Sequence, residues 1–329
     1  MNKVLVTGGA GFIGSHLVDE LLRRGNEVVV LDNLINGSLD NLTHALQNNN
    51  CTFIEGSILS KSDLERCMKQ VDVVYHLACM GVRHSLHSPK ENHDVNATGT
   101  LNALEAGKAE GVKKFFYIST SEVYGKVDTF PIKETYLPKP ITVYGSSKLV
   151  GEHYTISYTE CFGLDATVIR IFNNYGPRAH YEGDAGEIIP RTIVKALYGQ
   201  PPVIFGDGSV TRDFFYVKDT ARVLCDLMKL DGLKGDTFNL GTGLEISMKE
   251  LVHTILLNLP DFKGEIEYLQ DRPADVPRLW VDSSKLRAVL PYKPEVTFEN
   301  GIKNTIEYYK ALKQSKDLLK DLKTINWSK

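Results

Sequence analysis

The sequence predicts an α/β fold in which helices cover both faces of a doubly wound parallel sheet. Short apolar runs alternate with segments of helical periodicity through the first half of the 329 residues, and the runs are continuously apolar. Strand–helix alternation is typical of a parallel sheet, and a sheet buried on both faces needs strands without polar alternation. The expected strands are residues 4–6, 28–31, 52–54, 73–76, 115–119 and 166–171, and the expected helices are 14–24, 61–69, 89–110 and 144–162.

The second half of the chain predicts a smaller, mixed α/β domain. Clusters of Gly and Pro divide it into short elements. We place the first domain at residues 1–170, rejoined by part of 214–242, and the second at 171–329. Because no low-complexity linker separates them, the two domains are expected to pack closely. Helical periodicity in the second half covers residues 188–198, 219–229, 248–258 and 301–313.

Composition and charge exclude several classes of function. Lys and Arg number 38 and Asp and Glu 41, so the net charge of −3 gives no basic surface for nucleic acid or an anionic membrane. No apolar run approaches the roughly 20 residues that span a bilayer. The five cysteines are scattered, without the CxxC spacing of a zinc site, and fit a reducing compartment. We therefore expect a cytoplasmic protein that holds no metal and binds neither nucleic acid nor membrane.

A glycine-rich segment, TGGAGFIG at residues 7–14, follows the first expected strand and opens the first expected helix. Gly8 and Gly11 allow a tight turn and the close approach of a pyrophosphate, and Gly14 allows the helix to pack on the strand. Free N–H groups at the helix N-terminus favour the same anion. Asp32 ends the next strand, where a carboxylate can accept hydrogen bonds from a ribose and would repel a 2′-phosphate. The pattern predicts a Rossmann domain that binds NAD rather than NADP.

A second motif, YGSSK at residues 144–148, stands at the start of an expected helix. The spacing of four residues places Tyr144 and Lys148 on one helix face. A phenol with a pKa of about 10 is a poor base, but an adjacent ammonium and the positive ring of the cofactor favour its phenolate. Tyr144 could then accept a hydroxyl proton while the same carbon is oxidised.

Together these motifs resemble the extended short-chain dehydrogenases/reductases, and within them the nucleotide-sugar epimerases and dehydratases. The resemblance implies a retained NAD, a nucleoside-diphosphate sugar as substrate (with UDP, dTDP or GDP) and a homodimer. It runs nearly end to end and is also carried by HLAC at 76–79, NATGT at 96–100, STSEVYG at 119–125, RIFNNYGP at 170–177, GDGSVTRD at 206–213 and RPAD at 272–275.

The resemblance also implies roles for individual residues. Ser57 stands where the family often has Asp, so it offers the adenosine only a hydroxyl, and Arg83, His84 and His87 are left outside the expected site. The implied catalytic residues are Tyr144, Lys148, Thr120, Ser121 and Glu122. The implied cofactor contacts are Gly8, Gly11, Phe12, Ile13, Gly14, Asp32, Asn33, Asn36, Ser57, Ile58, Leu77, Ala78, Asn96, Tyr144 and Lys148. The implied substrate contacts are Asn173, Arg212, Arg272 and Asp275, and the guanidinium groups among them suit a diphosphate because they grip phosphate oxygens as a fork.

The segment TSE at residues 120–122 bears most directly on the reaction. Within the family, C4 epimerases typically carry no acid there. The 4,6-dehydratases carry Thr-Asp-Glu, with Asp as the acid toward the leaving hydroxyl and Glu as the base at C5, and UDP-glucuronate decarboxylases carry Thr-Ser-Glu. This chain has the decarboxylase triad, yet GEIIPR at 186–191 lacks the GRVVSN of those enzymes, and FNNYGP at 172–177 favours a dehydratase.

All three reactions begin with oxidation of C4 to a ketone. The ketone acidifies C5–H or lets a C5 carboxylate leave, because the resulting carbanion is stabilised as an enolate, and Glu122 could move the C5 proton. We rank dehydration first, decarboxylation of UDP-glucuronate second and 4-epimerisation third. A non-catalytic nucleotide-binding regulator is the alternative from a different class, and the intact pair of Tyr144 and Lys148 argues against it.

Overall fold

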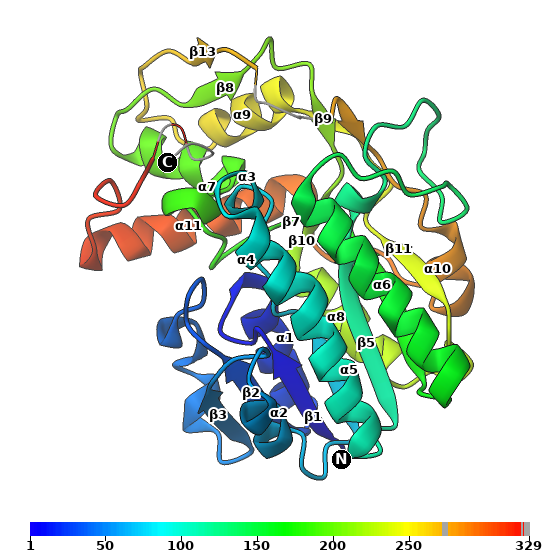
Figure 1. Ribbon diagram of the computed structural model, residues 1–329. Helices are drawn as coiled ribbons and strands as arrows, with labels where there is room; N and C mark the ends of the chain where they lie inside the picture. The colour runs from blue at the N-terminus through cyan, green and yellow to red at the C-terminus, as the bar shows by residue number, and fades with distance from the viewer. Residues whose placement is uncertain (272–275, 324, 326–329) are drawn as a thin grey trace.

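The computed structural model describes residues 1–271, 276–323 and 325. Its centre is a parallel sheet of seven strands in the order β11–β6–β5–β4–β1–β2–β3, so the expected doubly wound parallel sheet is confirmed (Figure 1). The strands are β1 (Lys3–Thr7), β2 (Glu27–Asp32), β3 (Cys51–Glu55), β4 (Val73–His76), β5 (Lys114–Thr120), β6 (Ala166–Ile171) and β11 (Thr237–Leu240).

Helices cover both faces of the sheet because successive strand residues point to opposite sides. On one face, Val4 and Val6 of β1 belong to a core that also contains side chains of α1 and α8. On the other face, Leu5 belongs to a core with side chains of α2, α5 and α6, and α5 and α6 lie in front of the sheet in Figure 1. These helices are α1 (Phe12–Arg23), α2 (Lys61–Cys67), α5 (Gly99–Ala109), α6 (Val143–Phe162) and α8 (Val217–Leu227).

A third core lies beside the sheet, where α7, α9 and α11 pack together through Ile193, Leu251 and Ile306. Short strands flank it, and two of them, β7 and β10, pair in parallel. Within the described residues, no helix combines the length and the apolarity that crossing a membrane requires. The elements here are β7 (Asn173–Tyr175), α7 (Ile188–Leu197), β8 (Val203–Phe205), β9 (Thr211–Arg212), β10 (Phe214–Tyr216), β12 (Ile246–Ser247), α9 (Met248–Leu257), β13 (Glu267–Leu269), β14 (Arg278–Leu279), α10 (Ser284–Val289) and α11 (Phe298–Ser315).

Two differences from the sequence expectation concern the central sheet and the helices that cover it. The helix expected over residues 89–110 is divided into α4 (Pro89–His93), a π-helical turn η3 (Asp94–Thr98) and α5; such turns often accompany functional sites. Strand β11 was not among the expected strands, because its sequence TFNL is short and half polar. It forms through parallel pairing with β6, which places Thr237 opposite Val168.

A buried ion pair joins α6 to the sheet. Arg170 of β6 donates from Nε and Nη2 to the two carboxylate oxygens of Glu152 on α6, at 2.9 and 2.6 Å. Ser119 of β5 donates to the same carboxylate at 2.5 Å. The third guanidinium nitrogen donates to Tyr124 Oη at 2.8 Å, and that hydroxyl donates to Asn239 of β11 at 2.7 Å. One network therefore fixes the position of α6 against three strands.

Removing one partner of this ion pair should destabilise the fold. Glu152 and Arg170 are only 1% and 5% exposed, so Glu152→Ala would leave an uncompensated buried guanidinium. We expect a loss of about 3–5 kcal/mol in the free energy of unfolding, measured by urea denaturation followed by circular dichroism. Glu65→Ala is the control, because the Lys61–Glu65 pair spans 3.8 Å on the surface of α2 and should contribute less than about 1 kcal/mol. Equal losses in the two variants would contradict the assignment.

Candidate functional site

A cavity of about 510 Å³ lies at the carboxyl ends of β1, β2, β4, β5 and β6, between the sheet and the third core. Elements from both halves of the chain line it, since Gly8 follows β1 while Met248 begins α9. The sequence-predicted site residues that line this cavity are Gly8, Gly11, Phe12, Ile13, Gly14, Asp32, Asn33, Asn36, Ser57, Ile58, Leu77, Ala78, Thr120, Ser121, Glu122, Tyr144, Lys148, Asn173 and Arg212.

The glycine turn between β1 and α1 forms one end of the cavity. Gly8 has a φ of +72°, which L side chains rarely adopt, and a Cβ there would lie 2.7 Å from the backbone nitrogen of Ala78. A Cβ at Gly14 would collide with the carbonyl of Gly8. Gly11 is the N-cap of α1 and provides no side-chain cap, so the first N–H groups of the helix are left to a ligand. The turn therefore fits the pyrophosphate of a dinucleotide.

Asp32 lies at the end of β2 beside this turn. Its Oδ2 accepts a hydrogen bond from the backbone N–H of Ala10 at 2.9 Å, and its Oδ1 accepts one from Leu34 at 2.8 Å. Burial raises the pKa of Asp32 above its ordinary value, although these N–H donors act in the opposite direction. Its carboxylate is thus held rigidly at the cavity wall, at the position that the sequence pattern assigns to ribose recognition.

Tyr144 and Lys148 project from the first turns of α6. Thr142 caps this helix by accepting a hydrogen bond from the Gly145 N–H at 3.0 Å, which sets where the helix begins. Lys148 Nζ donates to the carbonyl of Ile118 on β5 at 2.6 Å. This hydrogen bond holds Lys148 against β5, the strand that ends in Thr120.

The electrostatics of this pair oppose ionisation of the phenol. Desolvation raises the pKa of Tyr144 well above 10, and the negative charges of Cys79, Glu122 and Glu187 would raise it further, whereas a hydrogen bond with Thr120 lowers it. Burial lowers the pKa of Lys148. Phenolate formation therefore depends on positive charge brought close to Tyr144.

The structure places the remaining predicted residues elsewhere. Asn96 does not line the cavity: it is 1% exposed, its Oδ1 accepts from Met80 N at 2.8 Å and its Nδ2 donates to Met80 O at 3.0 Å. Asn96 thus holds the backbone of Met80, which lines the cavity, and its role as a cofactor contact stays a prediction. Arg272 and Asp275 lie outside the described residues.

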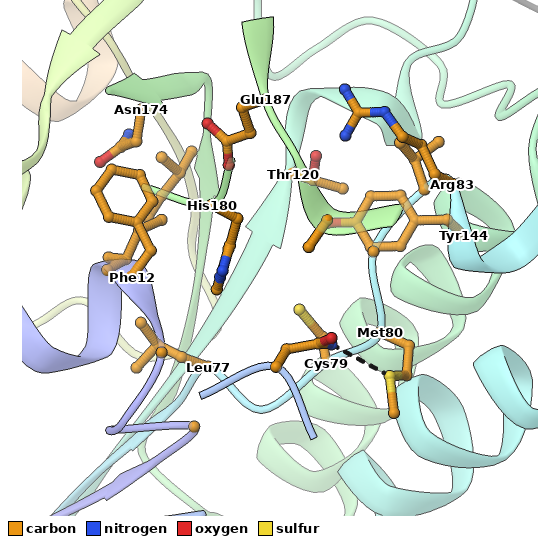
Figure 2. A pocket seen from close by; sticks show the side chains of 18 of the residues that line it. Phe12, Leu77, Cys79, Met80, Arg83, Thr120, Tyr144, Asn174, His180 and Glu187 are labelled. Carbon is orange, nitrogen blue, oxygen red and sulfur yellow. Dashed lines mark hydrogen bonds between the residues drawn. The ribbon is translucent and has the colours of Figure 1, made fainter. Parts of the chain in front are cut away.

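Several lining residues were not assigned to the site from the sequence. His180 and Glu187 come from the segment that leads into α7, and Arg83 comes from the segment after β4; Figure 2 shows all three around the space that Thr120 and Tyr144 border. Desolvation lowers the pKa of His180 and raises the pKa of Glu187 to about 7, against the opposing effect of Arg83. The only sequence signal for Glu187 was its place in GEIIPR, where related decarboxylases carry Arg.

Comparison with known proteins places this site in a family. A family model described as GDP-mannose 4,6 dehydratase matches residues 5–305. A putative UDP-glucose 4-epimerase from Methanocaldococcus jannaschii is 38% identical over 310 residues, which cover 93% of this chain and 98% of that protein. UDP-glucuronic acid decarboxylase 1 from Arabidopsis thaliana is 34% identical over 314 residues, which cover 94% of this chain and 70% of that protein.

Solved structures agree with this relationship. A dTDP-glucose 4,6-dehydratase from Streptomyces venezuelae, solved with NAD and TYD bound, matches with a TM-score of 0.89 at 30% identity and covers 95% of this chain and 98% of that one. The similar proteins thus comprise an epimerase, a decarboxylase and a dehydratase.

The role of Asp32 can be tested by cofactor binding. Asp32→Ala removes the carboxylate that would repel a 2′-phosphate, so the ratio of the NADP and NAD dissociation constants should fall by roughly tenfold, or about 1.4 kcal/mol. Isothermal titration calorimetry with both dinucleotides measures this ratio. Asp40→Ala, at an exposed position outside the cavity, should leave the ratio unchanged. Wild-type protein that binds NADP as tightly as NAD would show that Asp32 does not read the ribose.

Proposed function

Because the chain belongs to the GDP-mannose 4,6-dehydratase family of extended short-chain dehydrogenases/reductases, we propose that it is an NAD-retaining nucleotide-sugar 4,6-dehydratase. It is an enzyme of the group that contains nucleotide-sugar epimerases, dehydratases and decarboxylases. The proposed reaction oxidises C4 of a nucleoside-diphosphate hexose to a ketone and then eliminates water across C5 and C6. Return of the hydride to C6 and of a proton to C5 would complete the cycle and leave a retained NAD in its oxidised form. The nucleotide is UDP, dTDP or GDP.

The observation that supports chemistry beyond C4 is the position of Glu122. This carboxyl lines the same cavity as Tyr144 and Thr120, and its backbone N–H is held by Thr120 Oγ1 at 3.2 Å. Inversion at C4 alone needs a base at the C4 oxygen only, which Tyr144 can provide. A second base beside the sugar has a use when C5 must lose its proton.

Different residues of the cavity would hold the cofactor, accept the C4 hydroxyl proton and accept the C5 proton. The glycine turn, Asp32 and Lys148 would hold NAD, which supplies the oxidising power that turns the C4 hydroxyl into a ketone. Tyr144 accepts the proton of that hydroxyl, and Thr120 orients the phenol through the hydrogen bond between them. Glu122 accepts the C5 proton, which the neighbouring ketone has acidified. Lys148, which is 2% exposed and lines the same cavity as Tyr144, would contribute positive charge that favours the phenolate.

Decarboxylation of a nucleoside-diphosphate uronic acid is the second candidate. One observation favours it: the guanidinium of Arg83 comes from a segment that lines the cavity and could receive a sugar carboxylate. The carboxyl of Glu187 in the same cavity would repel such a substrate when ionised. Because the related proteins cover all three reactions, we prefer dehydration on the ground that it uses Glu122 as the base at C5, whereas carbon dioxide leaves without a base.

The purified protein should be incubated with UDP-glucose, dTDP-glucose, GDP-mannose and UDP-glucuronate, and the products should be weighed by mass spectrometry. The proposal predicts loss of water from one of the neutral hexoses. Loss of carbon dioxide from UDP-glucuronate would identify a decarboxylase, and an epimer of unchanged mass would identify an epimerase. No conversion of any of the four would contradict the proposed substrate class.

Tyr144→Phe should abolish turnover while NAD still binds. The ring keeps its packing, but no oxygen remains to accept the C4 hydroxyl proton, so kcat should fall at least about 100-fold. Tyr154→Phe is the matched control, because Tyr154 lies on the same helix outside the cavity and should keep wild-type activity. Residual activity above about 1% in Tyr144→Phe would exclude Tyr144 as the base.

Glu122→Gln separates chemistry at C5 from chemistry at C4. The amide keeps the size of the carboxylate but cannot accept a proton, so elimination of water and exchange of the C5 hydrogen in D₂O should both be lost, by roughly 100-fold or more. A plain 4-epimerase would keep nearly full turnover in this variant. Glu160→Gln, at an exposed position on α6, serves as the control. Wild-type turnover in Glu122→Gln, together with no C5 exchange in the wild-type enzyme, would refute the dehydratase proposal.

A further inference from the structure

Among the residues that the structure describes, four carboxyls line the cavity: Asp32, Glu122, Asp184 and Glu187. The mechanism above uses the first two. Asp184 already accepts a hydrogen bond from His87 Nε2 at 2.6 Å and from Lys323 Nζ at 3.2 Å. Glu187 is therefore a carboxyl in the reaction cavity whose chemistry is not yet accounted for.

The backbone around Glu187 directs its side chain into the cavity. Glu187 is the N-cap residue of α7, but its side chain makes no capping hydrogen bond. Its backbone N–H donates to the carbonyl of His180 at 2.7 Å, which closes the preceding loop. Figure 2 shows its carboxyl in the space bordered by Thr120, Arg83 and Tyr144. No capping hydrogen bond holds the carboxyl at the end of α7, and Arg83 is the charged group that acts on it within the cavity.

Elimination of water needs an acid that the sites already described do not supply. Hydroxide is a poor leaving group, so the C6 oxygen must be protonated as it departs. Tyr144 is engaged at the C4 oxygen, and Glu122 receives the proton from C5. Ser121, 3% exposed beside them, has only a weakly acidic hydroxyl. We propose that Glu187 is the general acid that protonates the departing C6 hydroxyl, an inference that rests on the proposed dehydratase function.

The elimination step balances with these two carboxyls. The C5–H bond of the 4-keto sugar breaks and its proton passes to the Glu122 carboxylate, while its electron pair forms the C5=C6 double bond. The C6–O bond breaks, and the oxygen takes the proton of the Glu187 carboxylic acid and leaves as water. Glu122 ends protonated and Glu187 ends ionised, and neither an oxidant nor a reductant is needed in this step.

The electrostatic surroundings suit an acid at this position. Desolvation raises the pKa of Glu187 to about 7, against the opposing charge of Arg83, so a large fraction of the carboxyl carries a proton at neutral pH. The charge of an ionised Glu187 contributes to raising the pKa of Tyr144 on α6 and of Tyr309 on α11, although desolvation is the main cause for both. A protonated Glu187 is thus compatible with a Tyr144 phenolate, whereas an ionised one opposes it. The other ionisable groups that line the cavity are Asp32, Cys79, Arg83, Glu122, Tyr144, Lys148, His180, Asp184 and Arg212.

The test compares two leaving groups at C6. Wild-type enzyme and Glu187→Gln are each given the hexose nucleotide that the wild-type enzyme dehydrates, chosen from UDP-glucose, dTDP-glucose and GDP-mannose, and its 6-deoxy-6-fluoro analogue. Fluoride leaves as a stable anion without prior protonation. In Glu187→Gln, kcat on the hydroxyl substrate should fall by about 10²–10⁴-fold and kcat on the fluoro substrate by less than about tenfold. A purely structural role would lower both rates equally.

Two further variants and a pH profile complete the test. Glu182→Gln makes the same change in the same loop but outside the cavity lining, and should leave both rates unchanged. Glu187→Asp keeps a carboxylic acid and should retain part of the activity on the hydroxyl substrate. In the wild-type enzyme, kcat on this substrate should fall as the pH rises through about 7, because the acid loses its proton, and this fall should be absent with the fluoro substrate.

The outcomes distinguish this inference from the function on which it rests. Equal losses on both substrates, or no loss in Glu187→Gln while the wild-type enzyme releases water, would overturn the acid role and leave the dehydratase proposal intact. Release of no water from any of the three hexoses by the wild-type enzyme would overturn both. Binding of NAD by each variant confirms that the folded cavity is present.

Discussion

The buried ion pair between Glu152 and Arg170 fixes the geometry on which the site depends. Glu152 lies one helical turn after Lys148 on α6, and its carboxylate also accepts a hydrogen bond from Ser119, the neighbour of Thr120 on β5. The pair therefore sets the helix against the strand so that Tyr144 reaches Thr120. Separating two buried charges is costly, so a shift of α6 along β5 and β6 that broke this pair would be strongly unfavourable.

The walls of the cavity come from two parts of the chain, the edge of the sheet and the loop before α7. The sheet provides rigid positions, since the turn after β1, the end of β2 and the end of β5 all open on the same edge. The opposite wall comes from the loop before α7, which carries His180 and Glu187. Contacts with the C-terminal segment brace this wall. The N–H of Gly183 in the loop donates to the carbonyl of Asp321 at 2.9 Å, and Arg191 on α7 donates to the carbonyl of Lys323 at 2.5 Å. The cavity is thus closed by segments that lie far apart in the sequence.

Desolvation favours the neutral form of three ionisable groups that line the cavity, namely Tyr144, Lys148 and Glu187. It raises the pKa of Tyr144 and Glu187 and lowers that of Lys148, so each group is shifted toward its neutral form. Protons can then move between groups whose neutral and charged forms are closer in free energy than in water. Such a cavity suits a reaction that removes a proton from one carbon and delivers a proton to the oxygen of the next.

Local patterns in the sequence were enough to predict several features of the protein. The apolar strands, the TGGAGFIG turn and the spacing of Tyr144 and Lys148 are short-range properties, and they predicted the confirmed parallel sheet and the residues that line its edge. Asn96 shows the limit of local patterns. The NATGT motif does not reveal that the Asn96 amide forms hydrogen bonds with the backbone N–H and carbonyl of Met80. Only the folded chain shows that β11 pairs with β6, that Glu187 lines the same cavity as Tyr144, and that desolvation shifts the pKa values of these two side chains. Each of these depends on which distant segments exclude water from a side chain, and a linear pattern does not encode that exclusion.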